Sequence, residues 1–184
     1  GGVYFGPPED FSPDRCGDCQ NQLRLAEEWH GAGEGQILVD ASIHAEYTSC
    51  PPLWEWTAGF ARKRGLGMQV HISETQSEHE SCRKKYGTTP IALFDQYGVW
   101  ERGGIAAHCV WVSDQDMDIM ARKRITAVHN PVSNLKLASG VARVPRMQKA
   151  GVNVALGTDG VASNNSHDLF EEIKLAALLH KGAG

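Results

Sequence analysis

The feature that most constrains the fold is the alternation of short β-rich runs with longer amphipathic stretches from residue 36 onward. Apolar residues in the longer stretches recur at spacings of three and four, as on one face of a helix, for example Leu53, Trp56 and Phe60. Strands that alternate with helices in this way form parallel sheets. We therefore predict an α/β fold with five strands, over residues 36–43, 68–72, 105–110, 125–129 and 152–156.

The first 35 residues differ from this pattern. A lead rich in proline and glycine, Gly6-Pro7-Pro8, precedes a polar helix that we predict from about Pro13 to Trp29. A domain seldom begins with a helix whose partner strand is missing. We therefore interpret 1–35 as a helical lead from a preceding unit, and 36–184 as the part that contains the sheet.

Composition excludes several classes of protein. The chain is 41% hydrophobic and 22% charged with a formal charge of −4, which is typical of a soluble globular protein and gives no basic surface for nucleic acid. No run approaches the roughly 18 apolar residues of a membrane span, so we predict a cytoplasmic protein without a membrane partner. The five cysteines show no disulfide framework, and we interpret the Cys16-Gly17-Asp18-Cys19 motif as two incidental thiols.

Each predicted strand ends in a residue that is able to do chemistry. His44, His71, His108, His129 and Asp159 come at or just after the five strand ends, and Glu74 follows His71 by three residues. The carboxyl ends of parallel strands form one rim, so we expect these side chains to gather there. Neutral imidazoles and a carboxylate are ligands for a divalent metal, and glutamate and histidine can transfer protons. The sequence predicts a metal-assisted hydrolytic site.

The ordered motifs resemble those of the amidohydrolase superfamily. They are His71-x-x-Glu74, Ala107-His108-Cys109, His129-Asn130-Pro131-x-Ser133-Asn134-Leu135-Lys136-Leu137 and Gly157-Thr158-Asp159-Gly160-x-x-Ser163-Asn164-Asn165. Within it, the chain looks most like the 5′-methylthioadenosine/S-adenosylhomocysteine deaminases and their chlorohydrolase and guanine deaminase relatives. The resemblance implies a partial (β/α)₈ barrel. Residues 36–184 would form about strands four to eight with their helices, without the first strands and the small β-domain.

The resemblance also implies roles for individual residues. His71 and Asp159 would bind one divalent metal, zinc or alternatively iron. Glu74 would shuttle a proton to the ring nitrogen beside the carbon under attack, and Asp159 would accept the proton released by water. His108 would hydrogen-bond the attacking oxygen and the tetrahedral centre. A further group would contact the substrate, namely His44, Ser163 and His129, of which His129 would either orient substrate or only brace its strand.

One motif of the superfamily is missing. The His-x-His pair that supplies two metal ligands from the first strand occurs nowhere in these 184 residues. Catalytic zinc takes at least three protein ligands, so we expect weak metal binding or none in this chain alone. The length also falls short of the roughly 250 residues of a closed barrel. We therefore expect a fragment whose missing N-terminal part is its main partner, with an open sheet that favours association of copies.

Three functions remain open at this stage. The first is hydrolytic deamination of a purine nucleoside such as S-adenosylhomocysteine, 5′-methylthioadenosine or adenosine. The second keeps the same chemistry on a guanine, cytosine or halogenated triazine ring. The third is a non-catalytic half-barrel that binds a purine-like ligand or takes part in an assembly, against which stands the joint presence of Glu74, His108 and Asp159.

Overall fold

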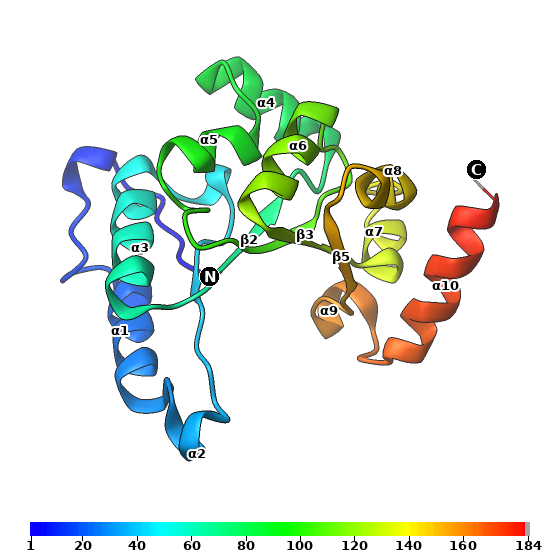
Figure 1. Ribbon diagram of the computed structural model, residues 1–184. Helices are drawn as coiled ribbons and strands as arrows, with labels where there is room; N and C mark the ends of the chain where they lie inside the picture. Colours follow the sequence, from blue (N-terminus) through cyan, green and yellow to red (C-terminus); the bar gives the residue numbers. More distant parts are fainter. Residues whose placement is uncertain (183–184) are drawn as a thin grey trace.

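A five-stranded parallel sheet forms the centre of the computed structural model, which describes residues 1–182 (Figure 1). The strands are hydrogen-bonded in sequential order, and every neighbouring pair is parallel. They are β1 (Ala41–Ser42), β2 (Met68–Ile72), β3 (Gly104–His108), β4 (Ile125–His129) and β5 (Asn153–Leu156). The predicted α/β fold with five strands is thus confirmed.

The first predicted strand was too long. Of residues 36–43, only Ala41 and Ser42 belong to β1, since only these two pair in register with β2, at Met68 and Gln69. On its other side, the N-terminus lies beside the end of β1: Gly2 forms a parallel bridge with Ile43, and its N–H donates to the Ser42 carbonyl at 2.9 Å. The lead therefore packs on the sheet through its first residues.

Helices follow one another around the outside of the sheet (Figure 1). Those between successive strands are η2 (Glu46–Thr48), α3 (Pro51–Arg64), α4 (Gln76–Tyr86), α5 (Pro90–Gln96), α6 (Asp114–Lys123), α7 (Pro131–Lys136) and α8 (Val144–Lys149). The remaining elements are η1 (Pro8–Asp10), α1 (Gly17–Trp29), α2 (Ala32–Gly35), α9 (Val161–Asn164) and α10 (Leu169–Gly182). Helices α1 and α3 lie at one end of the molecule and α10 at the other.

The core lies between the sheet and these outer helices. Met68, Val70 and Ile72 of β2 are buried, whereas Gln69 is exposed and His71 half-buried, as expected when successive side chains point to opposite faces. Aromatic rings fill the helix layer: the ring of Trp54 on α3 lies 5.3 Å from that of Phe94 on α5. The helix-facing side of the sheet is thus apolar, and His71 lies on the other side.

The start of α4 is defined by the side chains of its first turn. The Thr75 hydroxyl accepts the N–H of Glu78 at 3.2 Å, and the Glu78 carboxylate reaches back to the N–H of Thr75 at 3.5 Å. This capping box satisfies donors that have no partner within the helix. At the other end, Gly87 has φ +71°, a left-handed conformation in which glycine is unstrained. The turn between β2 and α4 is therefore well determined.

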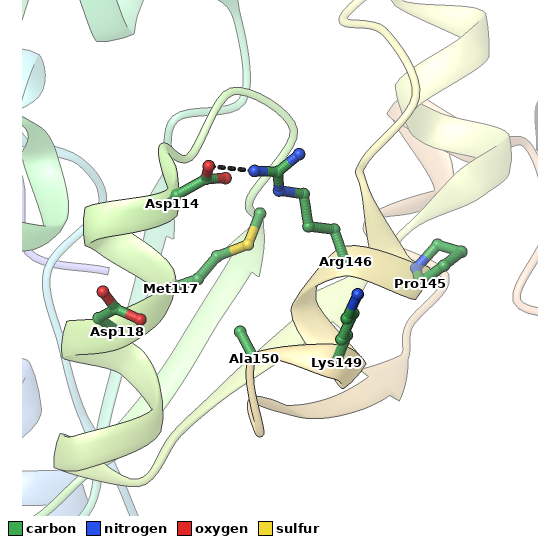
Figure 2. Close-up of a pocket in the computed structure, with 7 residues that line it drawn as sticks. All are labelled: Asp114, Met117, Asp118, Pro145, Arg146, Lys149 and Ala150. Carbon is green, nitrogen blue, oxygen red and sulfur yellow. Dashed lines mark hydrogen bonds and ion pairs between the residues drawn. The ribbon is translucent and has the colours of Figure 1, made fainter.

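The thiols and the outer surface add little chemistry. All five cysteines are free and buried. None of the helices within residues 1–182 has the length and apolar character to cross a membrane. A surface groove of about 540 Å³ between α6 and α8 is lined in part by Asp114 and Arg146, which pair across it (Figure 2). None of its lining residues belongs to the predicted site, so this groove is separate from the strand-end chemistry.

Candidate active site

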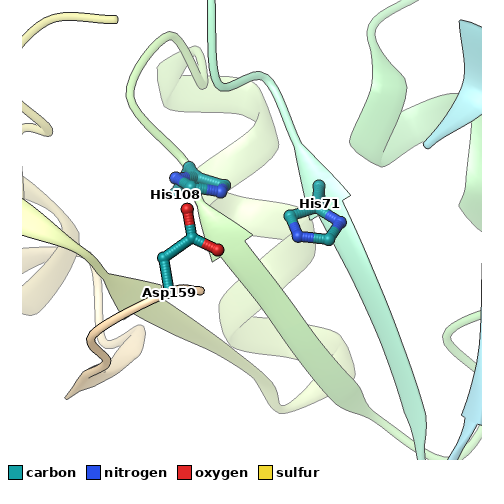
Figure 3. A group of neighbouring side chains, drawn as sticks. All are labelled: His71, His108 and Asp159. Carbon is teal, nitrogen blue, oxygen red and sulfur yellow. The ribbon is translucent and has the colours of Figure 1, made fainter. Parts of the chain in front are cut away.

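Three predicted site residues meet at the carboxyl ends of the strands. His71 is in β2, His108 ends β3, and Asp159 follows β5 in the loop before α9. One ligand atom of each lies within 4.8 Å of those of the other two, and Figure 3 shows the two imidazoles and the carboxylate facing one another. His108 is buried, and the other two are half-buried. The cluster is therefore accessible through His71 and Asp159.

The ring of His71 is held in one orientation by the neighbouring strand. Its Nδ1 lies 2.9 Å from the carbonyl oxygen of His44, to which it donates, and this leaves Nε2 without a proton and available as a ligand. Burial is the main influence on this side chain and lowers the pKa of His71. A neutral, oriented imidazole of this kind is what a divalent metal requires.

The carboxylate of Asp159 is held by hydroxyl and backbone donors. The Ser133 hydroxyl donates to Oδ2 at 2.7 Å. Burial by itself would raise the pKa of Asp159, but hydrogen bonds from Ser133 and the Gly160 N–H, followed by the nearby His108 and by Ser163, together bring the pKa below its ordinary value. The side chain is therefore ionised at neutral pH. It can act as a metal ligand or as an acceptor of a proton.

His108 contacts His71, Glu74 and Asn134. Its ring is nearly parallel to that of His71, with centroids 5.4 Å apart. Its Nδ1 lies 2.8 Å from Oδ1 of Asn134 and donates to it, so that Nε2 is directed toward the carboxylate of Glu74, at 3.6 Å from Oε2. This arrangement places two proton-transfer groups side by side at the edge of the cluster.

Glu74 is held by a residue that the sequence analysis did not identify. The Ser139 hydroxyl donates to Oε1 of Glu74 at 3.1 Å, and the indole N–H of Trp111 donates to the Ser139 carbonyl at 2.8 Å. Ser139 is buried and lies just after α7. No local pattern could have indicated it, because 65 positions separate it from Glu74. The role of Asn134 at His108 was likewise not predicted.

The predicted substrate-contacting residues lie in different surroundings. The ring of His44 lies 4.9 Å from that of His71, and its Nδ1 is 2.8 Å from the Thr48 hydroxyl. Ser163 reaches Asp159, as described above. Both residues therefore border the cluster.

His129 is not brought into this group. It is 2% exposed, its ring lies 5.3 Å from that of His180 on α10, and neither nitrogen has a hydrogen-bond partner within residues 1–182. It shares the buried face of β4 with Ile125 and Ala127. This placement agrees better with bracing the strand than with orienting a ligand.

Several site residues have an unusual backbone. Ser73, His108, Cys109 and Asp159 have φ values of +46°, +71°, +51° and +59°. Non-glycine residues adopt this left-handed region at a cost on the order of 1–3 kcal/mol each, and such residues concentrate at functional sites. His108, which pairs in register with Ile72 of β2, is the last residue of β3. Its left-handed backbone ends the regular alternation of side chains between the two faces of the sheet.

Comparison with known proteins places the chain in a family. The model of the amidohydrolase family matches residues 8–184. This chain belongs to the amidohydrolase family. An amidohydrolase relative from Dictyoglomus thermophilum, named 5-methylthioadenosine/S-adenosylhomocysteine deaminase, is 48% identical over 160 residues, which are 87% of this chain and 38% of that protein. A 5′-deoxyadenosine deaminase from Methanothermobacter thermautotrophicus is 44% identical over 164 residues, 89% of this chain and 38% of its own.

The fold agrees with a solved amidohydrolase structure. A zinc-bound adenosine deaminase from Xanthomonas campestris superposes with a TM-score of 0.83 at 32% identity, over 89% of this chain and 37% of that one. The sheet and its helices are thus part of an amidohydrolase barrel, as predicted. The chain spans well under half the length of the relatives it matches.

The residues present are suited to a divalent metal. His71 Nε2 and a carboxylate oxygen of Asp159 are free of protons for the reasons given above, and His108 adds a third possible ligand within 4.8 Å. Their outer hydrogen bonds to His44 and Ser133 are of the kind that orient metal ligands. The donor set therefore fits a divalent ion.

Proposed function

We propose that this amidohydrolase chain carries the catalytic face of a metal-dependent hydrolytic deaminase of purine nucleosides of the 5′-methylthioadenosine/S-adenosylhomocysteine type. The observation that carries the proposal is the convergence of Glu74, His108 and Asp159 beside His71 at the strand ends. The names of the two curated relatives and of the zinc-bound structure support the substrate class. A purely binding module would have no use for a proton-transfer pair beside possible metal ligands.

The proposed metal is a single zinc ion, with iron as the alternative. His71 and Asp159 would hold it, and the zinc in the Xanthomonas campestris deaminase supports this choice. When bound, such an ion supplies a water whose pKa is lowered toward neutrality. We further propose that a segment preceding this chain supplies the remaining ligands, because catalytic zinc takes at least three from the protein.

The side chains of this chain would move the protons of the reaction. Asp159, ionised and held by Ser133, accepts the proton that water releases. Glu74 delivers a proton to the ring nitrogen next to the amine-bearing carbon, which keeps negative charge from building up in the ring. A carbon–oxygen bond forms and the carbon–nitrogen bond breaks. The amine leaves as ammonia with the proton that Asp159 took from water, and the hydroxyl on the same carbon returns its proton to Glu74 as the carbonyl forms.

His108 and the neighbouring residues would orient the reacting groups. Its Nε2, near Oε2 of Glu74, would hydrogen-bond the attacking oxygen, because Asn134 holds the opposite nitrogen of the ring. His44 and Ser163 border the cluster and would contact the nucleoside. We assign these two residues to substrate binding on that placement.

The test compares Glu74→Gln with Glu80→Gln. Glu80 is an exposed residue of the nearby helix α4, so its substitution removes the same charge without touching the cluster. The substitutions are made in this chain within a protein of its relatives' length, and ultraviolet absorbance follows conversion of the adenine ring to hypoxanthine. Glu74→Gln is expected to lower kcat by about 100-fold or more at unchanged zinc content, and Glu80→Gln by less than about twofold.

A panel of compounds tests the substrate class. It contains 5′-methylthioadenosine, S-adenosylhomocysteine, 5′-deoxyadenosine and adenosine, with guanine, cytosine and a halogenated triazine as the other rings. Turnover of the adenine nucleosides alone is expected. Turnover of only another ring would overturn the substrate assignment, and wild-type activity in Glu74→Gln would overturn the catalytic one.

A further inference from the structure

Two buried carboxyl groups lie beneath the turn that carries Glu74. Glu78 is in the first turn of α4 and is 7% exposed, and Glu46 begins η2 and is 2% exposed. Neither belongs to the cluster of His71, His108 and Asp159. Acidic side chains are almost never fully buried unless they have partners, so both require an explanation.

The carboxylate of Glu78 binds the backbone of the turn. Its Oε1 accepts the N–H of Ser73 at 2.7 Å, and its Oε2 accepts the N–H of Glu74 at 2.8 Å as well as the longer bond from Thr75. An ordinary capping box holds only the last of these three. Glu78 therefore holds the backbone of Glu74 directly, together with Ser73, whose φ of +46° requires such support.

Glu46 has fewer donors of this kind, since among the described residues only its own backbone N–H donates a hydrogen bond that lowers its pKa. Its Oε2 is buried and accepts no hydrogen bond from any residue in the described part of the chain. The carboxyl groups of Glu46 and Glu78 lie near each other where η2 packs against α4, and burial, then the charge of Glu78, raise the pKa of Glu46 to about 8. The other titratable groups around Glu46 are Tyr47, Cys82 and Lys85.

The geometry decides which carboxyl group keeps the proton. Two ionised carboxylates in contact repel each other strongly where water is excluded, so the pair holds one proton at neutral pH. Burial raises the pKa of Glu78 as well, but three backbone N–H groups favour its charged form, whereas Oε2 of Glu46 has no donor within the described residues. The proton therefore resides on Glu46, where it can be donated to Glu78.

We propose that Glu46 is a buried carboxylic acid that donates a hydrogen bond to the Glu78 carboxylate, and that this pair positions Glu74. The positioning role rests on the deaminase function proposed above, in which Glu74 transfers a proton. Glu46 and Glu78 are positioning residues, because neither touches the cluster. The protonation of Glu46 does not depend on that function and can be tested separately.

The first experiment detects the proton without any activity. A protonated carboxyl group absorbs at a higher infrared frequency than a carboxylate, and at pH 6.5 the exposed carboxyl groups are ionised. This chain is expected to show a carboxylic acid band that is lost in Glu46→Gln and retained in Glu80→Gln. Absence of the band, or its persistence in Glu46→Gln, would refute the protonated pair.

The pH dependence of stability gives a second measurement on the same chain. A raised pKa means that the folded chain keeps a proton that the unfolded chain releases above about pH 4.5, so this contribution to stability is lost progressively up to about pH 8. The free energy of unfolding of the wild type, relative to that of Glu46→Gln, is therefore expected to fall between these pH values. A difference that is constant with pH would contradict the assignment.

The positioning role is tested by kinetics, in a protein of the relatives' length. Glu78→Gln and Glu46→Leu are each expected to lower kcat by about 10- to 100-fold, with KM changed by less than about threefold and zinc content unchanged. Glu46→Gln supplies a permanent neutral donor, so it is expected to recover most of the loss seen in Glu46→Leu and to extend activity above pH 8.

The outcomes separate this inference from the proposed function. Wild-type kcat in both Glu78→Gln and Glu46→Leu, with Glu74→Gln inactive, would refute the positioning role and leave the deaminase function intact. Absence of deaminase activity in the wild type would refute the function, and the infrared result would still decide the pair. If Glu78→Gln does not fold, the comparison of Glu46→Leu with Glu46→Gln decides the positioning role.

Discussion

Replacement of Glu172 by alanine is expected to release helix α10 from the rest of the protein. Glu172 is 0% exposed although it lies on the C-terminal helix of the described residues. Its Oε2 accepts the N–H of Val132 in α7 at 3.2 Å, and its Oε1 accepts the side-chain amide of Asn164 in α9 at 2.5 Å. One side chain thus links three helices, including the one whose Ser133 and Asn134 hold the cluster.

The expected change in the free energy of opening of α10 follows from these hydrogen bonds and from the small number of other contacts that hold the helix. A hydrogen bond to a charged group contributes about 1.5–3 kcal/mol. Apolar packing offers α10 little support, since Phe170 is 83% exposed and Leu169, Ile173 and Leu178 are about half exposed. We therefore expect Glu172→Ala to lower the free energy of local opening of α10 by about 3 kcal/mol, or roughly 100-fold in the opening equilibrium.

Hydrogen exchange followed by mass spectrometry measures this opening in peptides that cover α10. Glu171→Ala is the matched control, because Glu171 is the exposed neighbour on the same helix. Glu172→Gln keeps one acceptor oxygen and is expected to give an intermediate rate. Exchange in α10 that rises by less than about threefold in Glu172→Ala, or rises equally in Glu171→Ala, would refute the reasoning.

Three further predictions concern the cluster and its surroundings. In a protein of the relatives' length, His71→Ala is expected to weaken zinc binding by roughly tenfold or more in competition with a chromophoric chelator, and equal affinity would remove His71 from the site. Ser139→Ala, which takes the hydroxyl from Glu74, is expected to lower kcat by about tenfold with little change in KM in steady-state assays. Asp116→Ala removes an acceptor for Ser113 and should cost about 3 kcal/mol in denaturant unfolding, against less than about 1 kcal/mol for the exposed Asp114→Ala.

The positions of the main site residues could be predicted because strand order determines them. In a parallel sheet the carboxyl ends of all strands meet at one edge, so His71, His108 and Asp159 converge once the strands are identified. The same reasoning placed His129 with them, but alternation along β4 puts it on the buried face with Ala127. A strand end therefore predicts the edge of the sheet but not the direction of each side chain.

The supporting residues could not be predicted in the same way. Ser139 is 65 positions from Glu74, and Asn134 is 26 positions from His108, so no local spacing links either pair. The spacing of Thr75 and Glu78 is that of a capping box and could be recognised. The bonds of Glu78 to the N–H groups of Ser73 and Glu74 depend instead on the path of the turn before α4. These bonds to the backbone therefore leave no pattern of side chains in the sequence.

The strained backbone of the site explains why the strand-end residues need the supporting residues. Ser73, His108 and Asp159 adopt left-handed conformations that their residue types disfavour, so local propensity would predict none of them. Each has a partner in a neighbouring element: Glu78, five positions away in α4, holds the N–H of Ser73, while Asn134 and Ser133 of α7 hold the ring of His108 and the carboxylate of Asp159. The residues that do the proposed chemistry and those that hold them thus come from different segments. The orientation of these groups depends on hydrogen bonds from α4 and α7, so the geometry of the cluster is a property of the folded sheet and its helices rather than of any single motif.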